Sequence, residues 1–273
     1  MAGRSFNIVM IGAGNVATQL SQSLKIAGHN LQQVYSQSTD SAIGLAGKLT
    51  KNTSGPKKKL NKKNITDAIT NFSALSTTAD IYIIAIKDDA VTQLVKQLHL
   101  NNKLVVHTSG SLPMHVLKPA STNYGVFYPL QTISKDKTTD FLRVPICIEG
   151  NSKANEKILM ELADSLSEEV HLINSEKRKA LHLAAVFACN FSNHLFVLAA
   201  DLLKRNKLPF KLLLPLIQET VDKLNYGPPS KMQTGPAIRR DKKIVLMHLQ
   251  MLDKDPELKK LYKLLTESIQ NKA

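Results

Sequence analysis

A histidine and two asparagines on one predicted helix offer groups suited to proton transfer. A spacing of about 100° per residue places four positions on one line of that helix: His182, Val186, Cys189 and Asn193. Asn190 flanks this line. Because the unperturbed pKa of a histidine is about 6.5, His182 suits proton exchange at physiological pH. His182 and Asn190 are therefore candidate catalytic residues, and the alternative is a core histidine satisfied by a neighbour.

A cluster of hydroxyl groups follows a predicted strand, in the sequence His107-Thr108-Ser109-Gly110. Hydroxyl and backbone N–H groups at this position suit a ribose, a carboxamide or a substrate carboxylate. Ser109 is therefore a third catalytic candidate, and His107 and Thr108 are candidate cofactor contacts. The alternative is an ordinary exit from the strand, with Gly110 in a left-handed turn.

A second strand end contributes Ile86 and Lys87 as candidate cofactor contacts. The paired carboxylates that follow, Asp88 and Asp89, fit a helix start, with Asp88 as the N-cap. Acid–base chemistry is not expected of them, since nothing in the sequence pairs them with a catalytic partner.

The elements that must position these groups begin with a glycine-rich turn. An apolar run ends in the residues that are the main cofactor candidates: Gly12, Ala13, Gly14, Asn15 and Val16. Gly12 permits a sharp turn, and Gly14 lets the backbone approach a pyrophosphate. The helix that follows points unpaired N–H groups at the phosphates. Strand, turn and helix in this order predict a dinucleotide-binding unit; the alternative is a glycine turn in another α/β protein.

The end of the second predicted strand, Leu31–Tyr35, indicates which nicotinamide cofactor binds. NAD sites usually carry Asp or Glu here, whereas this chain has three further cofactor candidates: Ser36, Gln37 and Ser38. No carboxylate precedes Asp40, so nothing repels a 2′-phosphate. NADP is therefore favoured, with NAD as the alternative. The usual arginine is missing, and Lys48 is a candidate substitute.

Repeated strand–helix units predict a doubly wound parallel sheet. We expect strands at 79–86, 103–107, 144–149 and 170–173, a strand or loop at 124–132, and helices at 41–49, 90–98 and 154–166, with 65–75 ambiguous. Beyond residue 175 apolar spacing predicts helices at 180–200, 209–224, 238–252 and 256–270. The predicted fold is an α/β Rossmann-type doubly wound sheet in residues 1–175 followed by an all-α domain in residues 176–273.

The chain is strongly basic, with a formal net charge of +14. Seven lysines and no acidic residues lie between Lys48 and Lys63. We interpret this stretch as a solvated loop, because a nucleic-acid patch usually has interleaved aromatic residues and this stretch has none. Nucleic acid is therefore an unlikely partner, and a small-molecule substrate is expected.

Two widely separated cysteines, Cys147 and Cys189, exclude a disulfide framework and predict a reduced, cytoplasmic setting. Cys189 forms no closed ligand set with His182 and His194, so no metal site is predicted. Residues 180–200 lack Asp, Glu, Lys and Arg and are long enough to span a bilayer. Because polar groups within them are costly in lipid, we expect a helix buried inside protein and no membrane association.

The combination of motifs resembles a known family. Five stretches carry the resemblance over nearly the whole chain: Ala79 to Asp89, His107 to Leu112, Tyr128 to Thr132, His182 to Asn190 and Gly235 to Asp241. They resemble Rossmann-like proteins with a C-terminal DUF2520 domain, within the superfamily of 6-phosphogluconate dehydrogenase and pyrroline-5-carboxylate reductase. The resemblance implies NAD(P) binding, oxidoreductase chemistry, a helical domain like that of 6-phosphogluconate dehydrogenase, and a homodimer formed through that domain.

One departure from the wider superfamily affects the expected chemistry. Its β-hydroxyacid dehydrogenases carry Lys-x-x-x-Asn on the first helix of the second domain. Placing Asn190 on that asparagine puts Val186 at the lysine position, and no lysine lies between Lys179 and Lys204. The sequence therefore favours an NADP-dependent reductase of a small carbonyl or imine, with the substrate between residues 107–111, residues 128–131 and the His182 helix. The alternative is a non-catalytic NAD(P)-binding sensor or assembly protein.

Overall fold

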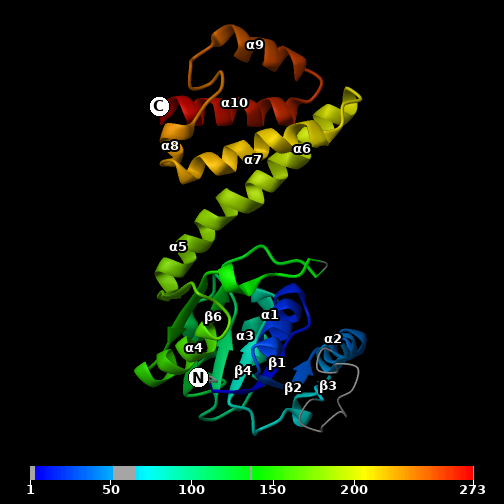
Figure 1. Cartoon of the computed structure of the whole chain (residues 1–273), viewed down its shortest axis with the longest axis vertical. Coiled ribbons are helices and arrows are strands. Elements are labelled where there is room, and N and C mark those ends of the chain that lie inside the picture. The colour runs from blue at the N-terminus through cyan, green and yellow to red at the C-terminus, as the bar shows by residue number, and fades with distance from the viewer. Residues whose placement is uncertain (1–3, 52–64, 136, 273) are drawn as a thin grey trace. The chain divides into compact units, whose positions relative to one another are not determined.

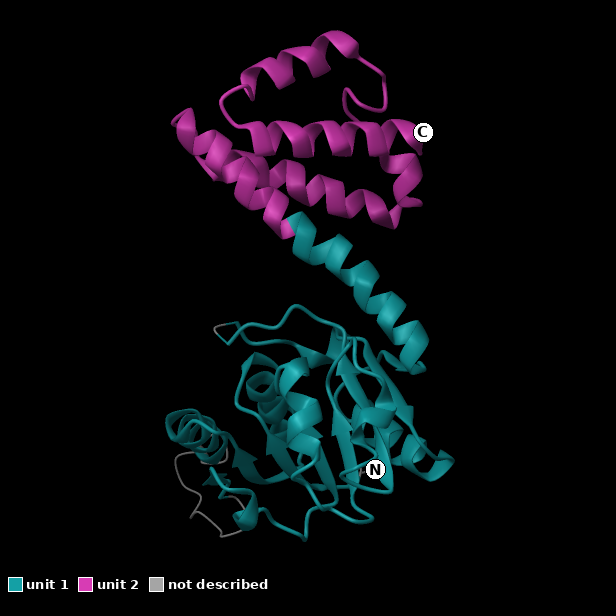
Figure 2. Ribbon diagram, turned by 180° about the vertical axis from the view of Figure 1, so that it is seen from behind, with its two compact units in different colours: residues 1–192 teal, residues 193–273 magenta. Residues whose placement is uncertain are grey.

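The computed structural model of the chain describes residues 4–51, 65–135 and 137–272. Compactness divides the chain into two units, residues 1–192 and 193–273 (Figure 2). The expected domain boundary at residue 175 coincides with the start of a helix that clusters with the first unit, and the boundary stays a prediction. Most of the basic stretch 48–63 lies outside the described residues.

The first unit is built on one eight-stranded sheet (Figure 1). Its strands are β1 Asn7–Ile11, β2 Asn30–Tyr35, β3 Asp67–Ile69, β4 Ile81–Ile84, β5 Leu104–His107, β6 Asn123–Pro129, β7 Ile146–Gly150 and β8 Val170–Leu172. They lie in the order β3-β2-β1-β4-β5-β6-β7-β8, and among these pairs β6 with β7 is the antiparallel one. The Rossmann-type sheet is thus confirmed, and its strand order reverses between β1 and β4, where such sheets bind ligands.

The strands read as apolar runs because both faces of the sheet are covered. Successive side chains point to opposite faces, so Ile8 and Met10 join one core and Val9 and Ile11 join the other. Helices α1 (Asn15–Ile26), α2 (Thr39–Lys51) and α4 (Lys153–Asp164) contribute to the first core, and α3 (Asp88–Val95) contributes to the second. The helices packed on both faces thereby hold the carboxyl ends of the parallel strands together along one edge of the sheet.

Short elements complete the first unit. These are the 3₁₀ helices η2 Phe72–Ala74, η3 Met114–Leu117 and η4 Phe141–Arg143, and the helix α5 Ser175–Ala185. The ambiguous segment 65–75 contains β3 and η2, and the segment 124–132 forms most of strand β6. The side-chain oxygen of Asn174 accepts a hydrogen bond from the Lys177 N–H at 3.0 Å. This cap satisfies a free donor and fixes where α5 begins.

Helix α5 continues through a π-helix, η5 (Val186–Phe191), into α6 (Ser192–Arg205). A π-helix closes its hydrogen bonds over five residues instead of four. The expected α-helical line from His182 through Cys189 to Asn193 is therefore wrong. Such π segments frequently occur at functional sites.

The expectation that this apolar helix is buried is also wrong for the described chain. The helix spans Ser175–Arg205, and none of its most apolar 18-residue window, with mean hydropathy 1.6, is buried. By length and composition alone it could cross a membrane. The side chains of Phe187 and Phe191 are 63% and 50% exposed. These apolar side chains are therefore largely open to solvent in the single described chain.

Helices joined by loops and turns make up the described residues of the second unit, 193–272. After α6 come η6 Phe210–Leu213, α7 Leu214–Asp222, η7 Lys223–Asn225, α8 Pro229–Met232, α9 Lys242–Met251 and α10 Pro256–Asn271. The helix expected at 209–224 is divided into η6, α7 and η7, and the helix expected at 238–252 begins later. Left-handed backbone at Gly235 (φ 105°) and Arg240 (φ 55°) delays that start, and Asp241 then caps α9.

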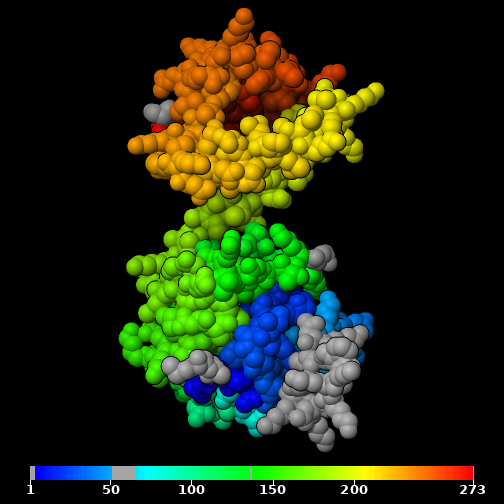
Figure 3. Space-filling model, viewed as in Figure 1, coloured from blue at the N-terminus to red at the C-terminus, as the bar shows by residue number. Residues whose placement is uncertain are grey.

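Large apolar side chains of the second unit lie mostly on its surface. Figure 3 shows atoms of the α7 region on the side of the molecule that faces the viewer. Large examples are Leu208, Leu212, Leu214, Leu216, Val221, Leu224, Leu246, Met247, Met251, Leu264 and Leu265. Among the described residues of this unit, the buried ones are Ala237, Leu252 and Thr266. The unit therefore consists of amphipathic helices whose apolar faces are largely uncovered.

Candidate active site

Gly12 occupies a position that admits no other residue. Its φ is +126°, a conformation that L residues rarely adopt. A Cβ added there would lie 2.2 Å from the Ala85 carbonyl oxygen. The Gly12 N–H donates to the Tyr35 carbonyl at 2.8 Å. The turn after β1 is thus locked against the ends of β2 and β4.

The start of helix α1 provides an anion-binding surface. Gly14 is its N-cap, and no atom lies within 4 Å of a Cβ added there. The first i→i−4 hydrogen bond runs from Thr18 N–H to the Gly14 carbonyl, so the N–H groups of the preceding helical residues are free for a ligand. The first turn carries no acidic residue. Open space, free donors and the helix dipole fit a pyrophosphate.

The other residues of this turn are placed around that surface. Ala13 and Val16 are half-buried and pack against the core, whereas Asn15 is exposed. The Asn15 side-chain amide donates to the Ile133 carbonyl at 3.1 Å. Ala17 is fully buried, as close packing of helix on strand requires. The predicted turn residues therefore share one side of the strand edge.

The end of β2 presents hydroxyl groups beside the start of α2. The Ser36 hydroxyl accepts from the Ser38 N–H at 3.2 Å, and the Ser38 hydroxyl accepts from the Ser41 N–H at 3.3 Å. Gln37 and Ser38 are exposed. Lys48 lies nine residues beyond Thr39 on α2, which is about 13 Å along the axis. The expected substitution of Lys48 for the missing arginine stays a prediction.

Asp88 is tied to the loop after β5 and does not cap its helix. Lys87 holds the N-cap position, and Asp88 is the first residue of α3. The Ser109 hydroxyl donates to Asp88 Oδ2 at 2.8 Å, and the Ser111 hydroxyl donates to the same oxygen. The predicted N-cap role is therefore wrong. At this position the Asp88 side chain accepts hydrogen bonds from two hydroxyl groups beside the start of α3.

Ser109 organises the loop that follows β5. Besides donating to Asp88, its hydroxyl accepts from the N–H groups of Ser111 at 3.1 Å and Leu112 at 3.0 Å. Gly110 is not left-handed, since the positive-φ glycines of the described chain are at positions 12, 28 and 235. The neighbouring Thr108 N–H donates to the Ile84 carbonyl at 3.1 Å. The loop is thus held by β4 and α3.

His107, at the end of β5, is fully buried. Burial and, to a smaller extent, the nearby positive charge of Arg178 together lower its pKa to about 4, against opposing effects of the Pro113 carbonyl, Asp88 and Glu149. The ring is therefore neutral near pH 7. Its Nδ1 accepts from the Ser109 N–H at 3.2 Å. His107 consequently shapes the loop and carries no charge.

The structure brings His182 against Tyr128 and Gly110. The Tyr128 hydroxyl and His182 Nδ1 lie 3.1 Å apart, and their rings meet edge to face with centroids 6.1 Å apart. A Cβ added to Gly110 would be 2.7 Å from the His182 ring and 2.9 Å from the Tyr128 ring. Burial raises the pKa of Tyr128, so its phenol stays protonated. A hydrogen-bonded phenol and imidazole therefore stand at the carboxyl edge of the sheet.

A buried ion pair supports the helix that carries His182. Arg178 Nη1 donates to Glu149 Oε2 at 2.6 Å. Sequence reasoning assigned no role to either residue and did not single out Tyr128 as a partner of His182. The sequence did contain one indication of the role of Arg178: it lies four residues before His182, which places both residues on one face of a helix.

The predicted site residues are thus only partly brought together. The groups after β1, β2, β4 and β5 lie at one strand edge, and His182 joins the loop after β5. Asn190 lies exposed in η5, and its catalytic role stays a prediction. No group of three or more His, Cys, Asp or Glu among the described residues has the arrangement of a metal site.

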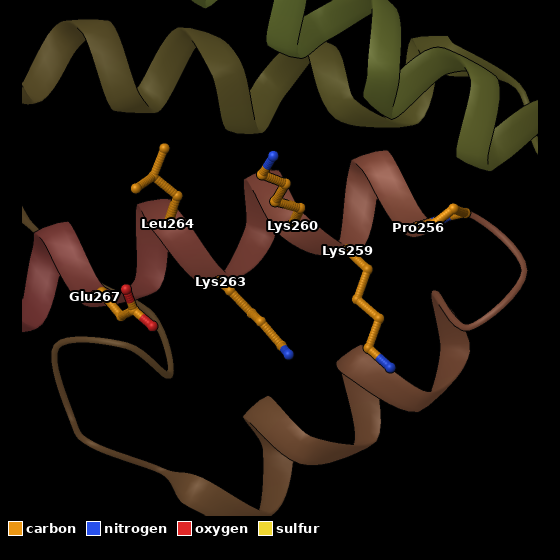
Figure 4. Close-up of a pocket in the computed structure, with 6 residues that line it drawn as sticks. All are labelled: Pro256, Lys259, Lys260, Lys263, Leu264 and Glu267. Carbon is orange, nitrogen blue, oxygen red and sulfur yellow. The ribbon is translucent and has the colours of Figure 1, made fainter.

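A separate groove lies within the second unit, along α10 (Figure 4). It is lined by Pro256, Lys259, Lys260, Lys263, Leu264 and Glu267. Lys259 and Lys263 point to one side of α10, and Lys260 and Leu264 point to the other. This groove is open and contains none of the predicted site residues.

A Rossmann sheet with open N–H donors at the start of α1 and a phenol–imidazole contact at the same edge fits an oxidoreductase that uses a dinucleotide. Residues 7–110 match the family described as NADP oxidoreductase coenzyme F420-dependent, and residues 144–269 match a domain of unknown function, DUF2520. No curated protein matches the chain.

Solved structures extend these matches over the whole chain. A candidate NADP oxidoreductase from Bacteroides fragilis is 41% identical, with 98% of each chain covered and a TM-score of 0.87. A protein from Thermotoga maritima is 20% identical, with 97% of this chain and 98% of that chain covered and a TM-score of 0.68. A reductive aminase from Aspergillus terreus, solved with NADPH and ethyl levulinate, is 13% identical, with 98% and 93% covered and a TM-score of 0.67. The last two show the fold alone.

The chain therefore belongs to the family that joins an NADP oxidoreductase domain to a DUF2520 domain. It is an NAD(P)-dependent oxidoreductase, and NADP is the cofactor of its family. The resemblance read from the sequence motifs is confirmed, as is the preference for NADP.

Proposed function

We propose that the chain is an NADP-dependent reductase of a small carbonyl or imine substrate. The observation that carries this proposal is the 3.1 Å contact between the Tyr128 hydroxyl and His182 Nδ1, beside Gly110 at the carboxyl edge of the sheet. A reduction of this class delivers a hydride to carbon and a proton to oxygen or nitrogen. The pair offers that proton.

The residues of the strand edge fit NADP. The free N–H groups at the start of α1 suit the pyrophosphate. Ser36, Gln37 and Ser38 suit the 2′-phosphate, because no carboxylate occurs in the sequence between Tyr35 and Asp40. When bound, the cofactor supplies the hydride, and the chain must hold the substrate and manage one proton.

In the proposed reaction the protonated phenol of Tyr128 donates its hydrogen bond to His182 Nδ1. As negative charge develops on the reduced oxygen or nitrogen, the pair releases this proton to it. His182 is half-buried, so solvent can restore the proton through the ring. Arg178 is unavailable to a substrate carboxylate, because it is fully buried and paired with Glu149.

The test is a screen of NADPH oxidation with aldehydes and ketones, each with and without a primary amine. We expect turnover by the wild type, with a rate in His182→Ala lower by about 100-fold and an unchanged NADPH dissociation constant. Turnover only when amine is present would assign an imine substrate. NADPH binding without any turnover would instead support the non-catalytic sensor, an alternative favoured by the missing superfamily lysine at Val186.

We further propose a cytoplasmic homodimer whose second copy covers the exposed apolar helices. The supporting observations are the uncovered side chains of Phe187, Phe191 and the second unit, together with two free cysteines. Analytical ultracentrifugation without detergent is expected to give twice the mass of the chain. A monomer that partitions into vesicles would contradict this proposal.

A further inference from the structure

Arg178 is a fully buried cation in the first turns of α5. Its guanidinium donates to Glu149 Oε2 at 2.6 Å, to the Leu112 carbonyl at 2.5 Å and to the Ser175 hydroxyl at 3.2 Å. These partners come from the end of β7, the loop after β5 and α5 itself. One side chain therefore joins three elements.

Ser175 completes this junction. Its hydroxyl donates to Glu149 Oε2 at 2.7 Å and accepts from the Met114 N–H at 3.0 Å. The start of α5 is consequently bound to β7, to the first residue of η3 and, through Arg178, to Leu112 in the segment between β5 and η3. That segment includes Gly110, which contacts the His182 ring.

His182 lies four residues after Arg178, on the same face of α5. We propose that the Arg178–Glu149 pair is the positioning pair that holds His182 against Tyr128 and Gly110. This inference rests on the proposed function only in taking His182 as a residue of the reaction site. Arg178 and Glu149 act through the helix and the loop and do not touch the reacting atoms.

The chemistry of the pair suits positioning. A buried ion pair adds little net stability, because desolvation of both charges offsets their attraction. The planar guanidinium, however, fixes direction, since its N–H groups bind several acceptors in a set geometry. A lysine at position 178 would present a point charge and could not reproduce these contacts.

The experiment compares the wild type with Arg178→Met, Arg178→Lys and Glu149→Gln, with Lys177→Met as the matched control on the exposed side of the same turn. The first readout is the nuclear Overhauser effect between the ring protons of Tyr128 and His182, measured without substrate. The second is NADPH affinity, and the third is the separate effect on kcat and KM.

We expect the ring contact to be lost in Arg178→Met and weakened in Arg178→Lys, with NADPH affinity within about twofold and kcat lower by about 10- to 100-fold. Lys177→Met should match the wild type in every readout. An intact ring contact and unchanged kcat in folded Arg178→Met would overturn the proposal. If Arg178→Met does not fold, the same criteria apply to Arg178→Lys. If the wild type turns over no substrate, the proposed function fails, while the ring contact still decides the positioning role.

Discussion

The two units of this chain use apolar residues in opposite ways. In the first, strands such as β1 and β4 bury every apolar side chain against helices on both faces of the sheet. In the second, helices such as α7 and α9 contain no buried residue in the single chain. The sheet of the first unit therefore has a complete core, whereas the helices of the second unit leave apolar faces uncovered in the single chain, which fits the proposed dimer.

The largest effect is expected in the turn that locks the first unit. Gly12→Ala places a Cβ 2.2 Å from the Ala85 carbonyl at a φ of +126°, which should lower the free energy of unfolding by about 3 to 4 kcal/mol and abolish NADPH binding. Chemical denaturation and NADPH titration measure both effects. Gly14→Ala is the matched control: its position is open, so folding should persist while NADPH binding weakens. Equal destabilisation by both substitutions would contradict this account.

A slightly smaller effect is expected from acid. In the unfolded chain the pKa of His107 is near 6.5, as for a free histidine, whereas burial and the charge of Arg178 lower it to about 4 in the folded chain. Between these values the unfolded state binds a proton that the folded state excludes. This difference in pKa contributes ~3 kcal/mol to the free energy of unfolding. The contribution is fully present above pH 6.5 and is lost as pH falls to about 4. Urea denaturation against pH should show this slope, and His107→Asn should flatten it, whereas the exposed His115→Gln should not.

The second unit should respond to charge on its apolar surface. Leu216, 63% exposed on α7 in the single chain, should lie at a contact between copies, where burying a leucine contributes about 2 kcal/mol. Leu216→Glu should therefore shift sedimentation from dimer to monomer without affecting NADPH binding. Gln218→Glu adds the same charge on another side of α7 and should leave the mass unchanged. A dimer that persists in Leu216→Glu would place the contact elsewhere.

An effect of similar size to that of Leu216→Glu tests the site itself. Gly110→Ala introduces a Cβ 2.7 Å from the His182 ring, which must move away. We expect kcat to fall by about 10- to 100-fold, equivalent to ~1.4 to 2.8 kcal/mol, with NADPH affinity retained. Gly44→Ala, at a position with open space around it, is the control. Unchanged kcat in Gly110→Ala would mean that His182 and Tyr128 need not touch.

Much of the first unit could be predicted because local patterns there match tertiary burial. The apolar run of β4 reads directly as a strand buried on both faces, and the turn at Gly12 has a steric cause that the sequence displays. The edge that holds the predicted cofactor residues follows from these elements. The site residues outside this edge are positioned by tertiary contacts, which no local sequence pattern encodes.

The errors have physical causes. Asp88 resembles an N-cap in sequence, but Ser109 and Ser111 draw its carboxylate to the loop after β5. The alignment of Cys189 with His182 assumed an α-helix, and η5 alters the turn. The sequence did not show that the long apolar helix is exposed, because apolar composition predicts burial and the single described chain does not bury this helix. Arg178 was overlooked since a charged residue in a helix usually faces solvent.

The most direct test of the central claim is the steady-state kcat of Tyr128→Phe, measured with NADPH and the best substrate from the screen and set beside the NADPH dissociation constant. This variant keeps the ring edge against His182 and removes only the phenol oxygen of the 3.1 Å contact. A proton-donating pair predicts a kcat lower by at least about 100-fold, with unchanged NADPH affinity. Wild-type kcat in Tyr128→Phe would contradict the account.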